Sequence, residues 1–205
     1  MEQFTESIGT FLAQTLAGFA FKKRESCVLR QSTAGWQAIA IEVLPTASTG
    51  IGKLAAHARI RIETLEARYT PHHPFLKPKD AKTHATLTVN CDGLLKDKAL
   101  AHGFSLDAAV EADVIPWLEK YSDEQAVYEG LVDSDPRNWV TSDRLTRFPV
   151  LMAILAKRGD VPAFDAIAAE FQEWCKQKHA MVYAPLAAAM LNVRPTPNLN
   201  STRQP

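Results

Sequence analysis

The chain lacks the features that mark several specialised classes of protein. Its three cysteines, Cys27, Cys91 and Cys175, are odd in number and far apart, and no Cys-x-x-Cys pair occurs among its 205 residues. This usage argues against a secreted disulfide framework and is typical of a reducing compartment. No apolar run approaches the ~20 residues of a membrane-spanning helix, and Glu2 and Glu6 stand where a signal peptide would be basic. We therefore expect a cytoplasmic protein that does not associate with membranes.

The chain also has no net charge, because it contains 23 basic and 23 acidic side chains. Proteins that bind nucleic acids usually carry a strong basic excess, so this class is disfavoured. The sequence contains no Gly-x-Ser-x-Gly nucleophile elbow and no His-Glu-x-x-His metal motif. We expect no catalytic residue, no bound metal and no cofactor. The sequence favours a non-enzymatic protein, although it does not decide the question.

The first half of the chain combines one helical pattern with several strand patterns. Apolar side chains recur every three or four positions over residues 2–17, which predicts an amphipathic helix ended by Gly18. A short helical segment is expected at 64–69. Four segments alternate with period two and predict strands, the first with a break near Lys23–Glu25: 19–31, 37–44, 53–63 and 83–89.

The second half of the chain is helical after residue 104. Ser122 with Gln125 has the spacing of a capping box, Ser142 or Asp143 is expected to cap a later helix, and Asp160 opens another. Strands clustered before helices predict an α+β fold with a mainly antiparallel sheet, because βαβ units would alternate.

This pattern predicts two lobes and a tail. We expect a lobe of helix and antiparallel sheet over 1–104, and a helical lobe over 105–193 that joins it in one compact domain. Residues 194–205 are polar and contain several prolines, which predicts a disordered tail.

An acidic run is the least ordinary feature of the sequence. Residues 105–135 carry nine carboxylates and a single basic side chain, Lys120. A solvated helical surface explains such a run; the alternative is a docking face for a basic protein, where charge complementarity raises association rate and selectivity. The residues of this docking hypothesis, with one aromatic anchor, are Glu119, Asp123, Glu124, Glu129, Asp133, Asp135 and Trp139.

A second charged pattern lies on the predicted strand 53–63. His57, Arg59 and Arg61 alternate with apolar residues, so they share one face of the strand. That face is expected to be the solvated side of the sheet, and the alternative is a contact surface for phosphates of a nucleic acid.

The histidines and cysteines allow a metal or ligand site but do not specify one. Zinc sites need three or four ligands at short characteristic spacings, and adjacent histidines on an extended chain point in opposite directions. A solvated Pro-His-His-Pro loop is therefore expected at 71–74, and Cys175, four residues before His179, is expected in the core. The sequence leaves open whether four of these residues converge in space: His72, His73, His84 and Cys91.

Two short segments carry a family resemblance. Leu16–Lys23, followed by Val28-Leu29-Arg30, resembles the start of a bacterial family of domains of unknown function, in which a helix ends at Gly-Phe and a Lys-rich strand follows. Ile115–Tyr121 resembles the helix-plus-proline segment of that family. The resemblance brings no catalytic residues to this chain. It implies a binding role, because some relatives in fold are immunity proteins that neutralise a toxin.

Three hypotheses follow from these observations. The first is a non-enzymatic, immunity-like protein whose acidic helical face binds another protein, with self-association left open. The second is a small-ligand binder or metal-dependent enzyme whose pocket, between sheet and helices, uses the histidines of the first half. The third and weakest is nucleic-acid binding through Arg59 and Arg61.

Overall fold

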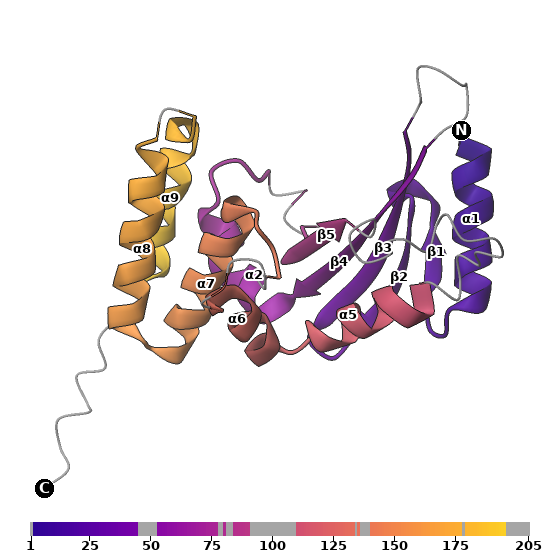
Figure 1. The fold of residues 1–205 in the computed structure, drawn as a ribbon, viewed down its shortest axis with the longest axis horizontal. Coiled ribbons are helices and arrows are strands. Elements are labelled where there is room, and N and C mark those ends of the chain that lie inside the picture. Colours follow the sequence, from indigo (N-terminus) through magenta and orange to yellow (C-terminus); the bar gives the residue numbers. More distant parts are fainter. Residues whose placement is uncertain are drawn as a thin grey trace, which may run out of the picture. The chain divides into compact units, whose positions relative to one another are not determined.

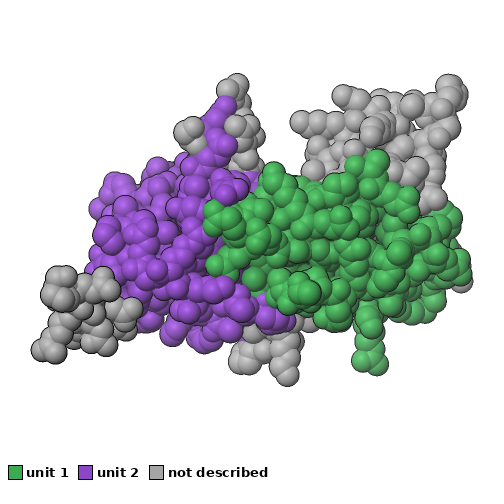
Figure 2. Space-filling view, turned by 90° about the horizontal axis from the view of Figure 1, so that it is seen from below, with its two compact units in different colours: residues 1–62, 87–127 green, residues 63–86, 128–205 purple. Residues whose placement is uncertain are grey.

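A computed structural model describes residues 2–44, 53–77, 80, 84–90, 110–133, 135, 140–177 and 179–195. The chain divides into two compact units, shown in different colours in Figure 2: unit 1 comprises Met1–Ile62 and Leu87–Val127, and unit 2 comprises Glu63–Thr86 and Tyr128–Pro205. The units are interleaved along the sequence, since residues 63–86 leave unit 1 between two strands. The lobe boundary expected at residue 104 lies outside the described residues.

Unit 1 is built on a sheet that has five antiparallel strands in the described part of the chain, in the order β1-β2-β3-β4-β5 (Figure 1). Together with the N-terminal helix and the later helices, this sheet confirms the predicted α+β class. The predicted break near Lys23–Glu25 is a 3₁₀ turn (η1), which ends at Ser26 with a left-handed φ of 47°. The strands are β1 (Ala20–Lys22), β2 (Cys27–Ser32), β3 (Gly35–Leu44), β4 (Lys53–Ile62) and β5 (Leu87–Asn90).

The helix α1 (Glu2–Thr15) contacts β1, β2 and β3. The approach is close, because a Cβ atom added at Gly9 would lie 2.1 Å from a ring carbon of Phe21. Gly18 follows the helix with a φ of 78°, a conformation that glycine adopts without steric cost. Gly9 is therefore required for the close packing of α1 against Phe21, and Gly18 for its left-handed backbone conformation.

A second helical segment completes unit 1. The π-helical turn η4 (Val110–Val114) leads directly into α5 (Ile115–Lys120), which contacts β4. Val114 and Leu118 are fully buried, one turn apart, and they form the apolar side of this segment. The next helix, α6 (Glu124–Val132), begins in unit 1 and ends in unit 2.

Unit 2 is helical in its described part. Its longest helices are capped as the sequence predicts: Asp143 accepts from the N–H of Leu145 at 3.1 Å, and Asp160 accepts from that of Ala163 at 3.1 Å. The helices pack around the stacked rings of Phe148 and Phe171, whose centroids are 4.7 Å apart. Its elements are α2 (Glu63–Tyr69), η2 (Thr70–His72), α7 (Arg144–Arg158), α8 (Val161–Cys175), η6 (Met181–Tyr183), α9 (Ala184–Met190) and η7 (Leu191–Val193).

Two further observations concern the ends and the helix lengths. Arg194, the first residue of the predicted tail, makes a bidentate pair with Asp165 at 2.7 Å, and residues 196–205 lie outside the described part. Within the described residues, no helix is both long enough and apolar enough to cross a membrane.

Candidate functional site

The acidic residues of the docking hypothesis are divided between the two units. Unit 1 holds Glu119, Asp123 and Glu124, whereas unit 2 holds Glu129 and a pair near the end of α6, Asp133 and Asp135. Trp139 lies outside the described residues. The residues of the docking hypothesis therefore do not form one surface of a single unit. Glu119, Asp123 and Glu124, which all belong to unit 1, are considered together below.

Local contacts engage these first acidic residues. Glu119, whose side chain is 60% exposed, pairs with Arg30 of β2 at 3.3 Å. Asp123 accepts a hydrogen bond from the backbone N–H of Ala126 at 3.0 Å, which makes it the N-cap of α6. Ser122, predicted as this cap, donates instead to the carbonyl of Leu118 at 2.7 Å. The prediction failed because the Ser122 hydroxyl is engaged by the carbonyl of Leu118 and by Gln37, and the contact with Gln37 comes from a distant strand.

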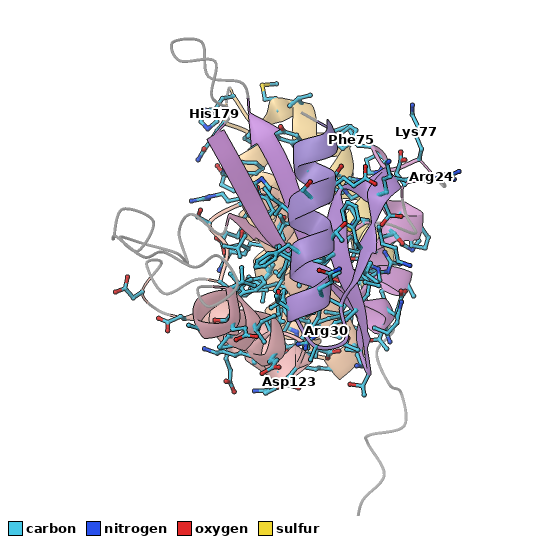
Figure 3. The ribbon with its side chains drawn as sticks, turned by 90° about the vertical axis from the view of Figure 1, so that its right-hand side faces the viewer. Arg24, Arg30, Phe75, Lys77, Asp123 and His179 are labelled. Carbon is cyan, nitrogen blue, oxygen red and sulfur yellow. The ribbon has the colours of Figure 1, made fainter. Side chains whose placement is uncertain are left out.

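A buried glutamine fixes the position of the turn that carries Glu119, Asp123 and Glu124, which we call the acidic turn. Gln37 of β3 is only 3% exposed; it donates to the carbonyl of Leu118 at 2.9 Å and to Ser122, and it accepts from Nε of Arg30. The C-terminal end of α5 is thereby held on the sheet. Figure 3 labels Arg30 and Asp123 at this end of unit 1. The sequence gives no signal for this role, since the register that brings Gln37 under α5 appears only in the fold.

The proposed basic face shares its side of the sheet with apolar residues. His57, Arg59 and Arg61 pair across β3 with Ala40, Ala38 and Trp36 respectively. The alternation is as predicted, because Ala58, Ile60 and Ile62 on the other face are buried. The expectation that this face is solvated is wrong for Arg61, which is only 7% exposed. A cluster of Cys27, Ala38 and Ala40 is also buried on the same side of the sheet.

Burial also makes the described cysteines unreactive. Burial, with the carboxylate of Glu25, raises the pKa of the Cys27 thiol to about 11, although the charge of Arg59 opposes the shift. Burial likewise raises the pKa of Cys175. Cys175 is buried, as predicted, and His179 is exposed beyond the end of α8, so the two side chains do not share a helix face. Neither thiol is a nucleophile at neutral pH.

The histidines that converge in unit 2 are His73 and His84, whose ring centroids are 6.1 Å apart. They lie beside Glu66 of α2, a carboxylate with no exposed surface. Glu66 accepts from the hydroxyls of Tyr69 and Thr86, at 2.5 and 2.8 Å, and contacts Nδ1 of His84 at 3.1 Å. We call these five residues, Glu66, Tyr69, His73, His84 and Thr86, the imidazole–carboxylate cluster.

The cluster was not predicted as a unit. The adjacent pair His72–His73 drew attention in the sequence, but the ring near His73 belongs to His84, and Cys91 and His102 lie outside the described residues. Glu66 carried a usable signal, because a carboxylate beside Leu65 and three residues before Tyr69 falls on the buried side of a short helix. In the described part of the chain, no three His, Cys, Asp or Glu side chains are placed to hold a metal ion.

No protein-family model, curated protein or solved structure matches this chain. The resemblance carried by Leu16–Lys23 and Ile115–Tyr121 therefore stays a prediction. The two candidate functional sites are the acidic turn of unit 1 and the imidazole–carboxylate cluster of unit 2.

Proposed function

We propose that the chain is a non-enzymatic protein-binding module whose contact surface is the acidic turn of unit 1, formed by Glu119, Asp123 and Glu124. The observation that carries the proposal is the buried anchor beneath this turn. Gln37 holds the carbonyl of Leu118 at 2.9 Å, one residue before Glu119. Carboxylates on a fixed backbone keep their geometry before a partner arrives, so binding costs little ordering entropy.

The chemistry of this surface selects a basic partner. Glu119 and Asp123 are exposed, and the only basic side chain between them is Lys120, which lies over the ring of Tyr121 at 4.9 Å. An acidic surface steers a basic protein towards it and raises the association rate, most strongly at low ionic strength. The family resemblance supports an immunity-like role, in which the partner is a basic bacterial toxin.

The test compares matched charge variants of the full chain. Glu119→Gln, Asp123→Asn and Glu124→Gln together remove three charges, and asparagine keeps the α6 cap. The control variant, Asp143→Asn, Asp165→Asn and Glu173→Gln, also removes three charges, all of them in unit 2, where they belong to one helix cap and two exposed ion pairs. Each protein is used to capture partners from an extract of the source organism, and association rates are then measured for any protein captured.

We expect the control variant to behave as the wild type. The acidic-turn variant should associate with the captured protein on the order of tenfold more slowly at low salt. Equal rates for all three proteins would refute the proposed surface. Failure to capture any protein that distinguishes the two variants would refute the binding function.

A further inference from the structure

The last helical segment of unit 2 carries no charge. Residues 180–193, which include η6, α9 and η7, contain no Asp, Glu, Lys, Arg or His side chain. A helix at the surface of a soluble protein usually carries charged residues on its outward side, whereas a helix that is apolar on every side is usually covered. Because α9 contacts α8 and η2, only part of its surface is covered within unit 2 (Figure 1).

The inward side of this segment is well packed. Leu186, Ala187 and Met190 are buried, and their spacing places them on one face of α9. Tyr183 of η6 stacks on Trp174 of α8 with ring centroids 5.9 Å apart, which fixes the start of α9 against α8. The position of the segment on unit 2 is therefore set by its inward side, and its outward side is not needed for this packing.

The outward side is apolar and exposed. Met181, Val182 and Leu191 are 62%, 64% and 39% exposed, and they are three of the six large apolar side chains that are exposed in the described residues. Ala184 and Ala188 are also exposed, between them in the sequence. We call these five residues the apolar face. Exposed apolar residues that gather in one place mark an interaction surface, whereas single ones are ordinary.

A groove runs between this segment and α8. Its floor includes Cys175 and Ala187, which are both only 3% exposed. Small side chains on a floor leave room for a larger apolar side chain from a partner, which would recover the contacts that the floor lacks. The groove has a volume of about 350 Å³ and is lined by Gln172, Cys175, Lys176, Met181, Ala184, Ala187 and Ala188.

The edge of the groove carries one charge of each sign. Lys176 pairs with Glu173 at 2.7 Å, and both side chains are 73% exposed. These charges cancel, so the edge does not steer a strongly basic or a strongly acidic partner. A second copy turned about a two-fold axis presents the same two charges in the reverse order, so acid can meet base on both sides. Exposed ion pairs contribute little, and the apolar surface supplies the affinity.

We propose that the apolar face binds a second copy of the chain and forms a two-fold symmetric dimer. In such a dimer the same patch is used by both subunits, so the patch must contain both the projecting groups and the space that receives them. The apolar face provides both, because Met181, Val182 and Leu191 are large and exposed beside a groove with a floor of small side chains. The proposal does not depend on the acidic turn, which belongs to unit 1.

The test measures the mass of the full chain by sedimentation equilibrium at concentrations up to about 0.1 mM. Ala188→Glu is the main variant, because Ala188 is exposed in the single chain but would bury an unpaired charge in the dimer. We expect it to raise the Kd of the dimer at least about a hundredfold. Ala166→Glu is the matched control, since Ala166 is an exposed alanine of α8 outside the groove, and it should leave the Kd unchanged.

A mixing experiment separates loss of the contact from loss of the fold. Ala188→Lys alone should weaken the dimer as Ala188→Glu does, and an equal mixture of the two variants should associate again, because their charges attract across the interface. A misfolded variant would not recover on mixing. A dimer that Ala188→Glu does not weaken, or no recovery on mixing, would overturn the proposal. A chain that stays monomeric throughout would also overturn it and would assign the groove to another occupant, such as a small apolar ligand.

Discussion

The acidic turn and the imidazole–carboxylate cluster use carboxylates in opposite ways. In the acidic turn, residues close together in the sequence supply the charge, and two of the carboxylates have separate contacts, Glu119 with Arg30 and Asp123 with the start of α6. In the cluster, residues as far apart as Glu66 and Thr86 direct three donors onto one carboxylate without exposed surface. High charge density along the sequence therefore produces a surface, whereas convergence in the fold produces a site.

This difference has an energetic consequence. An exposed ion pair contributes little, because water solvates both charges nearly as well. A buried carboxylate requires all of its donors, since any donor left unsatisfied in the interior costs its full desolvation free energy. The same residue type should therefore have very different effects on stability in the two regions.

The largest effect is expected for Glu66→Ala. The substitution removes the carboxylate that accepts from the buried hydroxyls of Tyr69 and Thr86 and from the partly exposed imidazole of His84, which should lower the free energy of unfolding by roughly 3–5 kcal/mol. Urea denaturation of the full chain measures it. Arg68→Ala, two residues further along α2 and exposed, is the control and should change stability by less than about 0.5 kcal/mol. Similar values for both would remove the contrast between the regions.

The next effect is expected for Gln37→Ala, which tests the buried anchor of the acidic turn. Loss of the amide leaves the carbonyl of Leu118 without its donor from the sheet, and should cost about 2 kcal/mol. Gln31→Ala, at an exposed position of β2, is the matched control in the same unfolding experiment. A cost for Gln37→Ala no greater than for Gln31→Ala would mean that the turn is not anchored.

A smaller effect concerns pH and His73. Because its pKa is lowered in the folded state, the unfolded chain binds more protons between that lowered pKa and about 6.5. The free energy of unfolding should therefore fall as the pH decreases below about 6.5, and should not depend on His73 above that value. His73→Gln should reduce this acid loss, and His179→Gln should not. Unfolding curves at pH 7.5 and 5.5 would contradict the account if both variants matched the wild type.

The smallest effect is expected for Glu119→Gln. The carboxylate is 60% exposed and its pair with Arg30 is 3.3 Å long, so its loss should change stability by less than about 0.5 kcal/mol. Urea denaturation measures this change too. A loss above about 1 kcal/mol would show that the acidic turn is structural rather than available to a partner.

The sequence predicted the elements well and the polar contacts poorly. Alternation located β3 and β4, the cap at Asp160 followed from residue type and position, and the cap of α7 was narrowed to Ser142 or Asp143, because these signals are local. The break at Lys23–Glu25 was also visible locally. The role of Gln37 depends on strand register and on the packing of α5, which single-sequence patterns do not contain.

The candidate sites show the same limit. The acidic run was visible because its members lie close together in the sequence, yet the sequence did not show that the run divides between two units. The meeting of Glu66, His73 and His84 depends on how residues 63–86 fold back between β4 and β5. The adjacent residues His72 and His73 pointed to a loop that does contribute to the cluster. The contact that forms, however, is between His73 and His84, which is distant in the sequence.

The central claim is that the buried carboxylate of Glu66 holds His84 in the Nδ1–H tautomer, whereas the backbone N–H of Phe75 holds the neighbouring His73 in the Nε2–H tautomer. The most direct measurement is ¹⁵N NMR of the histidine ring nitrogens in the intact chain at pH 7.5. The account predicts a protonated Nδ1 in His84 and a protonated Nε2 in His73. A protonated Nε2 in His84, with Nδ1 bare beside Glu66, would contradict it.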